Sequence, residues 1–180
     1  MKYIYTILTL LLVAAVAYIS FGSKSNKSGK AQRLACHKKS VVFEKVYSPV
    51  LLKEVQNALY AGEYKLTSRA DKSKYMKTRM FEYVDLKEVD ELVKTAIAGY
   101  KTATSATNDK VGVDYYIYEN DKSDPGKKTA KSKLYAGYLH FSFTYKGKRV
   151  YAVQVDFMDL KGKDIHKSVQ CAIKSIVTAS

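Results

Sequence analysis

The chain has 180 residues, of which 47% are hydrophobic and 12% are aromatic, with 16 tyrosines and no tryptophan. This length and composition fit one folded domain with an appendage and argue against a disordered chain. Lys and Arg outnumber Asp and Glu by 31 to 17, which gives a net charge of +14. Ten of these charges fall in residues 23–39, with six basic residues and no acid, and in residues 63–80, with six basic and two acidic.

The first segment predicts a membrane anchor or an export signal. Residues 3–22 carry no charge and follow Lys2, and about 20 apolar residues can cross a bilayer as a helix. Small residues would allow a signal peptidase to cut after Ala17 or after Gly22. We therefore expect residues 1–22 to be a transmembrane anchor, with a cleaved signal peptide as the alternative.

Residues 23–39 are rich in Ser, Gly and Lys and predict a basic flexible linker. Basic side chains beside a span are attracted to anionic lipid by about 1 kcal/mol each. The residues that we expect at this lipid surface are Lys24, Lys27, Lys30 and Arg33. Residues 40–180 would then form an exported α+β domain at the inner or plasma membrane, or a secreted one if the leader is removed.

The orientation of the chain is a conflict between two rules. The positive-inside rule places the domain in the cytoplasm, because the basic residues after the span outnumber the single Lys2 before it. The two cysteines, Cys36 and Cys171, favour export, since an even pair in an exported chain usually forms a disulfide. We predict that disulfide and an exported domain.

The elements that follow are read from caps and periodicity. Residues 41–47 suggest a short strand, and Ser48-Pro49 opens a helix that Gly62 ends. Residues 63–80 are ambiguous: residues 72–81 could be helical, or residues 79–84 could form an edge strand. The second helix begins at Asp85, and residues 111–119 alternate as a strand does. The apolar face of the second helix would comprise Leu86, Val89, Leu92, Val93, Ala96, Ile97 and Tyr100.

Residues 134–158 predict a long hairpin. The apolar positions recur with period two, at Leu139, Phe141 and Phe143 and again at Tyr151, Val153, Val155 and Phe157. A two-residue turn at Lys146-Gly147 would pair Phe143 with Val150 and put the two rows on opposite faces. A three-residue loop at residues 145–147, with Gly147 left-handed, would put both rows on one face. We therefore predict the three-residue loop.

A last helix starts near Asp164, with Cys171 on the side away from its apolar face. The fold class that results is α+β, with helices packed on a three- to four-stranded antiparallel meander and a closing C-terminal helix. An outward-facing cysteine suits a bond to an incoming arm, which supports the pairing with Cys36.

The signatures of most enzymes are absent from the sequence. It has no phosphate-binding glycine loop, no histidine pair at metal spacing, no close cysteine pair and no nucleophile elbow. We expect no metal and no cofactor, and we expect His37 and His166 to be solvated. The redox-switch alternative for the cysteines lacks a second thiol nearby that could resolve an intermediate.

Two surfaces are candidates for binding. The outer face of the hairpin would carry Tyr138, His140, Gln154 and Asp156. A basic segment would present Arg69, Lys72, Lys74, Lys77 and Arg79. We predict a non-enzymatic binding or assembly protein whose partners are the membrane and another envelope protein, and we do not expect nucleic acid. The alternatives are an exported inhibitor or immunity-type protein, and an exported hydrolase with His140 as a base oriented by Asp156.

Overall fold

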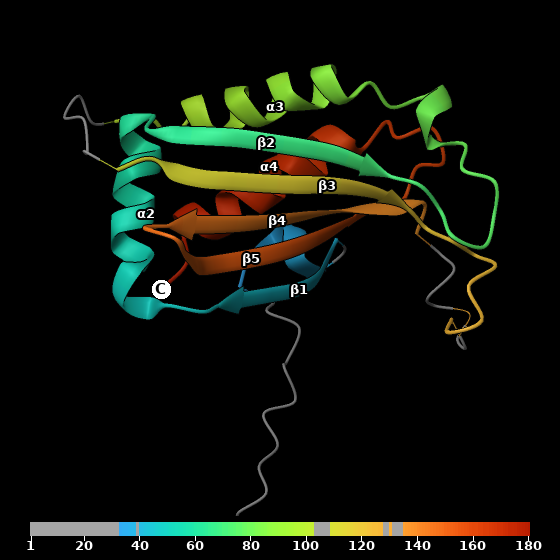
Figure 1. The fold of residues 1–180 in the computed structure, drawn as a ribbon, viewed down its shortest axis with the longest axis horizontal. Coiled ribbons are helices and arrows are strands. Elements are labelled where there is room, and N and C mark those ends of the chain that lie inside the picture. Colours follow the sequence, from blue (N-terminus) through green and yellow to red (C-terminus); the bar gives the residue numbers. More distant parts are fainter. Residues whose placement is uncertain (1–32, 39, 103–108, 128–129, 131–134) are drawn as a thin grey trace, which may run out of the picture.

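The structure is a computed structural model, and it describes residues 33–38, 40–102, 109–127, 130 and 135–180. Five strands form one sheet in the order β1-β5-β4-β3-β2, accompanied by three α-helices (Figure 1). The strands are β1 Val41–Val46, β2 Tyr64–Asp71, β3 Val111–Glu119, β4 Gly137–Tyr145 and β5 Lys148–Phe157. The helices are α2 Pro49–Ala61, α3 Leu86–Ala98 and α4 Ile165–Val177, with short 3-10 helices η1 Ala35–Lys38 and η2 Met80–Glu82. The predicted α+β class is confirmed.

The predicted anchor, residues 1–22, lies outside the described residues. None of the helices in the described part of the chain has the length and apolar content that a membrane crossing requires.

The antiparallel meander β3-β4-β5 is present as predicted. Along β3 and β4, buried residues alternate with half-buried ones from end to end. The buried row includes Tyr115, Phe141 and Phe143, which are at most 1% exposed. Period-two alternation therefore placed one row of each strand in the core, as the pleat requires.

The turn between β4 and β5 differs from the predicted three-residue loop. Only Lys146 and Gly147 form it, with φ angles of 49° and 72°, which is the backbone of a two-residue hairpin turn that matches the strand twist. Both apolar rows nevertheless share one face, because Phe143 pairs with Tyr151 and leaves Val150 as the extra residue of a bulge. The predicted faces are right and the predicted loop length is wrong.

The sheet is larger than predicted, and it is mixed. β2 pairs in parallel with β3, from Tyr64 opposite Val111 to Asp71 opposite Tyr118, and α3 forms the crossover that a parallel pair needs. Residues 72–81 are not a helix and residues 79–84 are not a strand; this region contains a loop and η2. The antiparallel meander of three or four strands is thus corrected to five strands, since β1 also joins, antiparallel to β5.

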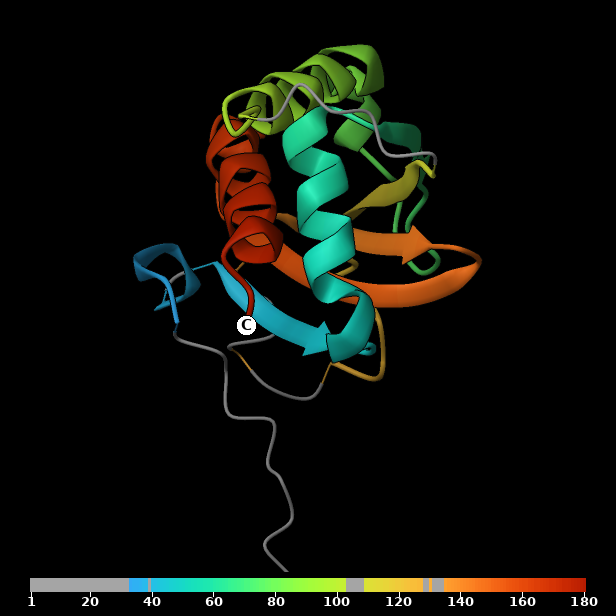
Figure 2. The same cartoon turned by 90° about the vertical axis from the view of Figure 1, so that its left-hand side faces the viewer.

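The three helices lie on one side of the sheet (Figure 2). The apolar residues of α4 face β5 and include Val169, Ala172, Ile173 and Ile176, all of which are buried. Gly62 ends α2 in the left-handed conformation, and Asp85 caps α3 by accepting a hydrogen bond from the amide of Lys87. Ser48 occupies the N-cap of α2, although its side chain makes no capping bond.

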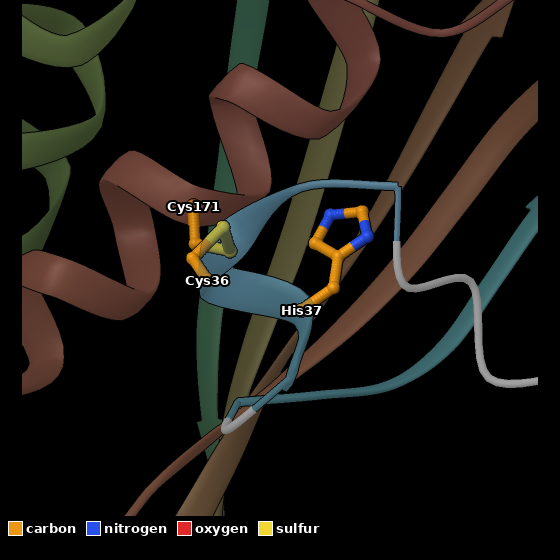
Figure 3. A group of neighbouring side chains, drawn as sticks. All are labelled: Cys36, His37 and Cys171. Carbon is orange, nitrogen blue, oxygen red and sulfur yellow. A yellow bond between two sulfur atoms is a disulfide. The ribbon is translucent and has the colours of Figure 1, made fainter.

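The predicted disulfide is confirmed. Cys36 on η1 is bonded to Cys171 on α4, with 6.0 Å between their Cα atoms and 135 residues between them in sequence (Figure 3). Cys171 lies on the side of α4 away from the sheet, yet it is only 3% exposed, because η1 covers it. Part of the predicted linker is therefore a turn of helix that is fastened to the last helix of the fold.

Candidate functional site

One face of the sheet has none of the described helices over it, and Figure 1 looks onto that face. The strand registers place the side chains that alternate with the core residues on it. These residues are Lys65, Thr67 and Arg69 of β2; Asp114, Tyr116 and Tyr118 of β3; Tyr138, His140 and Ser142 of β4; Ala152, Gln154 and Asp156 of β5; and Phe43 and Lys45 of β1. We call this surface the open face.

All four residues predicted for the hairpin's outer side lie together on the open face. Tyr138 is directly opposite Asp156, and His140 is directly opposite Gln154. The Gln154 amide donates a hydrogen bond of 3.2 Å to the carboxylate of Asp156. In this register Gln154 is the residue directly opposite His140. A histidine that acts as a general base would need a carboxylate at that position to orient its ring.

Tyr116 of β3 extends this group across the sheet. Its ring stacks on the His140 ring at 5.1 Å and meets the Tyr138 ring edge-on at 5.9 Å. On the other side, the Arg69 guanidinium lies 4.6 Å from the centre of the Tyr116 ring. A cation over an aromatic face is attracted by the ring quadrupole, so three neighbouring strands present one continuous layer of aromatic and cationic groups.

Burial and two arginines determine the protonation of His140 on the open face. Burial lowers the pKa of His140 from 6.5, and the positive charges of Arg149 and Arg69 lower it further. At neutral pH the His140 ring is therefore neutral, and it can donate or accept hydrogen bonds. Burial and the neighbouring Tyr116 raise the pKa of Tyr138, so its hydroxyl keeps its proton. This set of neutral rings flanked by guanidinium groups is suited to recognition by stacking and hydrogen bonding.

The predicted basic segment does not form a single surface. Arg69 joins the open face from β2, whereas Lys72, Lys74, Lys77 and Arg79 are exposed in the loop that follows this strand. Two carboxylates hold the loop that follows β2. Glu119 of β3 accepts a hydrogen bond from the Arg79 amide at 2.8 Å, and Asp121, in the segment after β3, accepts one from the amide of Tyr75. The lysines thus stand at the end of the sheet where β2 and β3 finish.

Two further side chains of the predicted linker, besides Cys36, make contacts within the fold. Arg33 was expected at a lipid surface, but its guanidinium donates to the backbone carbonyls of Ser175 and Thr178, at 2.6 and 2.7 Å, and to the carboxylate of Glu44. His37 was expected in solvent, but it is 2% exposed and bonds the hydroxyl of Ser175 at 2.7 Å. The interaction of Arg33 with the last carbonyls of α4 is favourable because a helix C-terminus attracts cations, so we no longer assign it to lipid.

Lys24, Lys27 and Lys30, the other residues predicted at the lipid surface, lie outside the described residues. His166 is exposed, as expected, and its Nδ1 lies 3.0 Å from the carbonyl oxygen of Lys163.

Cys36, His37 and Cys171 form the group that could hold a metal ion, with their sulfur and nitrogen atoms within 4.8 Å of one another (Figure 3). Metals such as zinc bind the thiolate form of cysteine. Both sulfur atoms are bonded to each other here, so this trio does not fit a metal in its oxidised form.

Glu44 is a residue with a buried side chain that the sequence did not single out. Its side chain is 7% exposed, and it accepts hydrogen bonds from Arg33 and from the hydroxyl of Tyr151. A carboxylate in a strand that pairs with β5 gives no local signal, because its partners come from residues far away in the sequence. Tyr116 could have been found, since it alternates with the buried Tyr115 on the same strand.

The fold and the open face define an α+β protein whose sheet is covered by helices on one side and is aromatic and basic on the other. Comparisons with protein families, with curated proteins and with solved structures gave no match to this chain.

Proposed function

We propose that this chain is a non-enzymatic binding protein of the cell envelope, held at the membrane by its N-terminal segment, whose open face binds another envelope protein. The observation that carries the proposal is the layer formed by Arg69, Tyr116, Tyr138 and His140 on a sheet face that no described helix covers. Tyrosine and arginine are among the residues that contribute most to protein interfaces, because they combine large contact area with hydrogen bonding.

Export of the domain is supported by the disulfide. Disulfide bonds form and persist in oxidising compartments such as the periplasm and the cell exterior, and they are rare in the cytosol. The Cys36–Cys171 bond joins two segments that are both ordered by other contacts, among them the hydrogen bonds of Arg33 and His37. The bond is therefore integrated with the packing of α4.

Two versions of this function differ in the fate of the leader. A subunit of a membrane complex keeps its anchor, and its intact N-terminus is then recovered from membranes. An exported inhibitor or immunity-type protein loses the leader, and its mature N-terminus is then Tyr18 or Ser23 in the soluble fraction. Cell fractionation with N-terminal sequencing separates the two, and two free thiols in protein alkylated inside intact cells would contradict export in either version.

The binding surface is tested by photocrosslinking in intact cells that make the full chain. A crosslinking amino acid at Thr67 or at Ser142, both on the open face, should give a defined adduct. The same amino acid at Lys53, an exposed position on α2, is the matched control and should give none. Tyr116→Ala should abolish the adduct from Ser142. Equal adducts from all three positions, or an adduct that survives Tyr116→Ala, would contradict binding at the open face.

The hydrolase alternative receives no support from the register of the hairpin. It needs a carboxylate to orient His140, and Gln154 is the residue opposite this histidine. We therefore retain the binding function as the conclusion.

A further inference from the structure

A cavity with a volume of about 750 Å³ lies between α3, α4 and η1, on the side of the helices away from the open face. Its wall includes Leu34 and Cys36 from the N-terminal side, residues of α3, and residues of α4. Figure 3 shows η1 against α4 with the disulfide between them. Ligand pockets usually measure about 300–1,000 Å³, so this groove has the size of a small-molecule site.

The floor of the groove is apolar. Leu92 and Ala96 lie one helical turn apart on α3, and they line the cavity together with Leu34 and the disulfide. Leu92 was predicted in the buried face of its helix, but it is 37% exposed. A leucine on the apolar face of a helix is left accessible here because the groove separates it from α4.

The basic side chains that line the groove come from one helix. They are His166, Lys167 and Lys174 of α4, and no Asp or Glu is among the described residues that line the groove. Lys167 and Lys174 are seven residues apart, about 10 Å along a helix, and neither is in an ion pair with any described residue. Uncompensated positive charge beside an apolar floor selects a ligand with an apolar tail and an anionic head.

We infer that this groove binds a long-chain fatty acid, with the acyl chain along Leu34, Leu92 and Ala96 and the carboxylate beside Lys167 or Lys174. The position of the groove agrees with this ligand if the proposed anchoring is right. Leu34 follows Arg33, and an extended chain from residue 22 to residue 33 spans at most about 40 Å. The mouth of the groove is then within reach of the membrane surface, where fatty acids partition.

The inference is tested with purified full-length protein in a non-ionic detergent and a hexadecanoic acid that carries a photoreactive diazirine. After irradiation, adducts mapped by mass spectrometry should fall on the segments of η1, α3 and α4 that line the groove. Unlabelled hexadecanoic acid should compete, whereas hexadecanol, which lacks the charge, should compete at least about tenfold less well. Shorter fatty acids should also compete less well, by about fourfold for each methylene removed.

Two variants distinguish binding in the groove from non-specific labelling. Ala96→Phe fills the floor and should reduce labelling about tenfold or more. The double variant Lys167→Gln with Lys174→Gln removes only exposed charges, so the fold is retained. In this variant hexadecanoic acid should compete no better than hexadecanol. Lys65→Gln on the open face is the matched control and should change neither readout.

Adducts spread over the whole chain, adducts on the open face, or equal competition by acid and alcohol would each overturn the inference. Unchanged labelling in the lysine double variant would overturn it as well, whatever Ala96→Phe does to folding. These outcomes do not depend on where the protein resides in the cell, so they are independent of the test of the proposed function.

Discussion

The two faces of the sheet are built from the same strands, yet they differ in every physical respect. On the helix side, Tyr115, Phe141 and Phe143 are removed from water in the core between the sheet and the helices α2, α3 and α4. On the open face, Tyr116 and His140 are half-buried, and their rings stack on each other across β3 and β4. Neighbouring residues of one strand thus contribute to the core on one face and to the proposed binding surface on the other. Substitutions on the two faces should therefore separate the free energy of unfolding from binding.

The largest effect is expected for Phe141→Ala on the helix side. The Phe141 ring is fully buried and stacks on Tyr115 at 5.0 Å. Removing a buried aromatic ring leaves a cavity and costs about 3–5 kcal/mol. Urea denaturation followed by circular dichroism measures the loss. A loss below about 1.5 kcal/mol would mean that the helices do not close over this face as described.

The next largest effect concerns the disulfide that holds η1 on α4. Replacing Cys36 and Cys171 by serine should destabilise the fold by about 2–5 kcal/mol, since the bond closes a long loop in the unfolded chain. The loss is measured by thermal denaturation of the double variant and of wild-type protein without reductant. Wild-type protein in the presence of a dithiol reductant should melt at about the temperature of the double variant. A reductant that leaves the wild-type melting temperature unchanged would count against the bond.

Glu44→Gln tests the buried carboxylate beside the helix side of the sheet. It removes a charge-assisted acceptor for Arg33 and for the Tyr151 hydroxyl, so a loss of about 1–3 kcal/mol is expected. Tyr151→Phe removes only one donor and should cost less. Denaturant unfolding of both variants gives the comparison. If Tyr151→Phe proves the more harmful of the two, Arg33 is not the principal partner of Glu44.

The smallest effect is expected for His140→Gln on the open face, which should change stability at neutral pH by less than about 0.5 kcal/mol. Its signature is the dependence on pH. Because the folded state lowers the pKa of His140 from 6.5, the unfolded chain binds a proton first as the pH falls. The wild-type protein should therefore lose stability below about pH 6.5, and His140→Gln should lose less over the same interval.

This comparison is made by urea denaturation at about pH 7.5 and about pH 5.5, for the wild type and the variant side by side. Parallel behaviour of the two proteins would show that His140 has the same pKa folded and unfolded, and that its burial and the two arginines do not shift this pKa.

Several features of the fold could be predicted because their causes are local. The alternation of residues 111–119 and 137–157 defined three strands and assigned Tyr138, His140, Gln154 and Asp156 to one face. Gly62 and Asp85 marked the ends of helices through their own backbone and side-chain preferences. The predicted faces of the hairpin are right although the predicted loop length is wrong, since burial of the apolar rows constrains register more strongly than the turn does.

What the sequence by itself determined, then, is which residues alternate, which helices are amphipathic, and that the two cysteines form a pair. Only the tertiary structure decided that β2 lies parallel to β3, that a bulge at Val150 restores the register, and that Glu44, His37 and Arg33 meet at α4. It also decided that Leu92 lies in a groove and not in the core. The reason is that these features depend on contacts between residues far apart in the chain, and such contacts leave no periodic pattern in either segment alone.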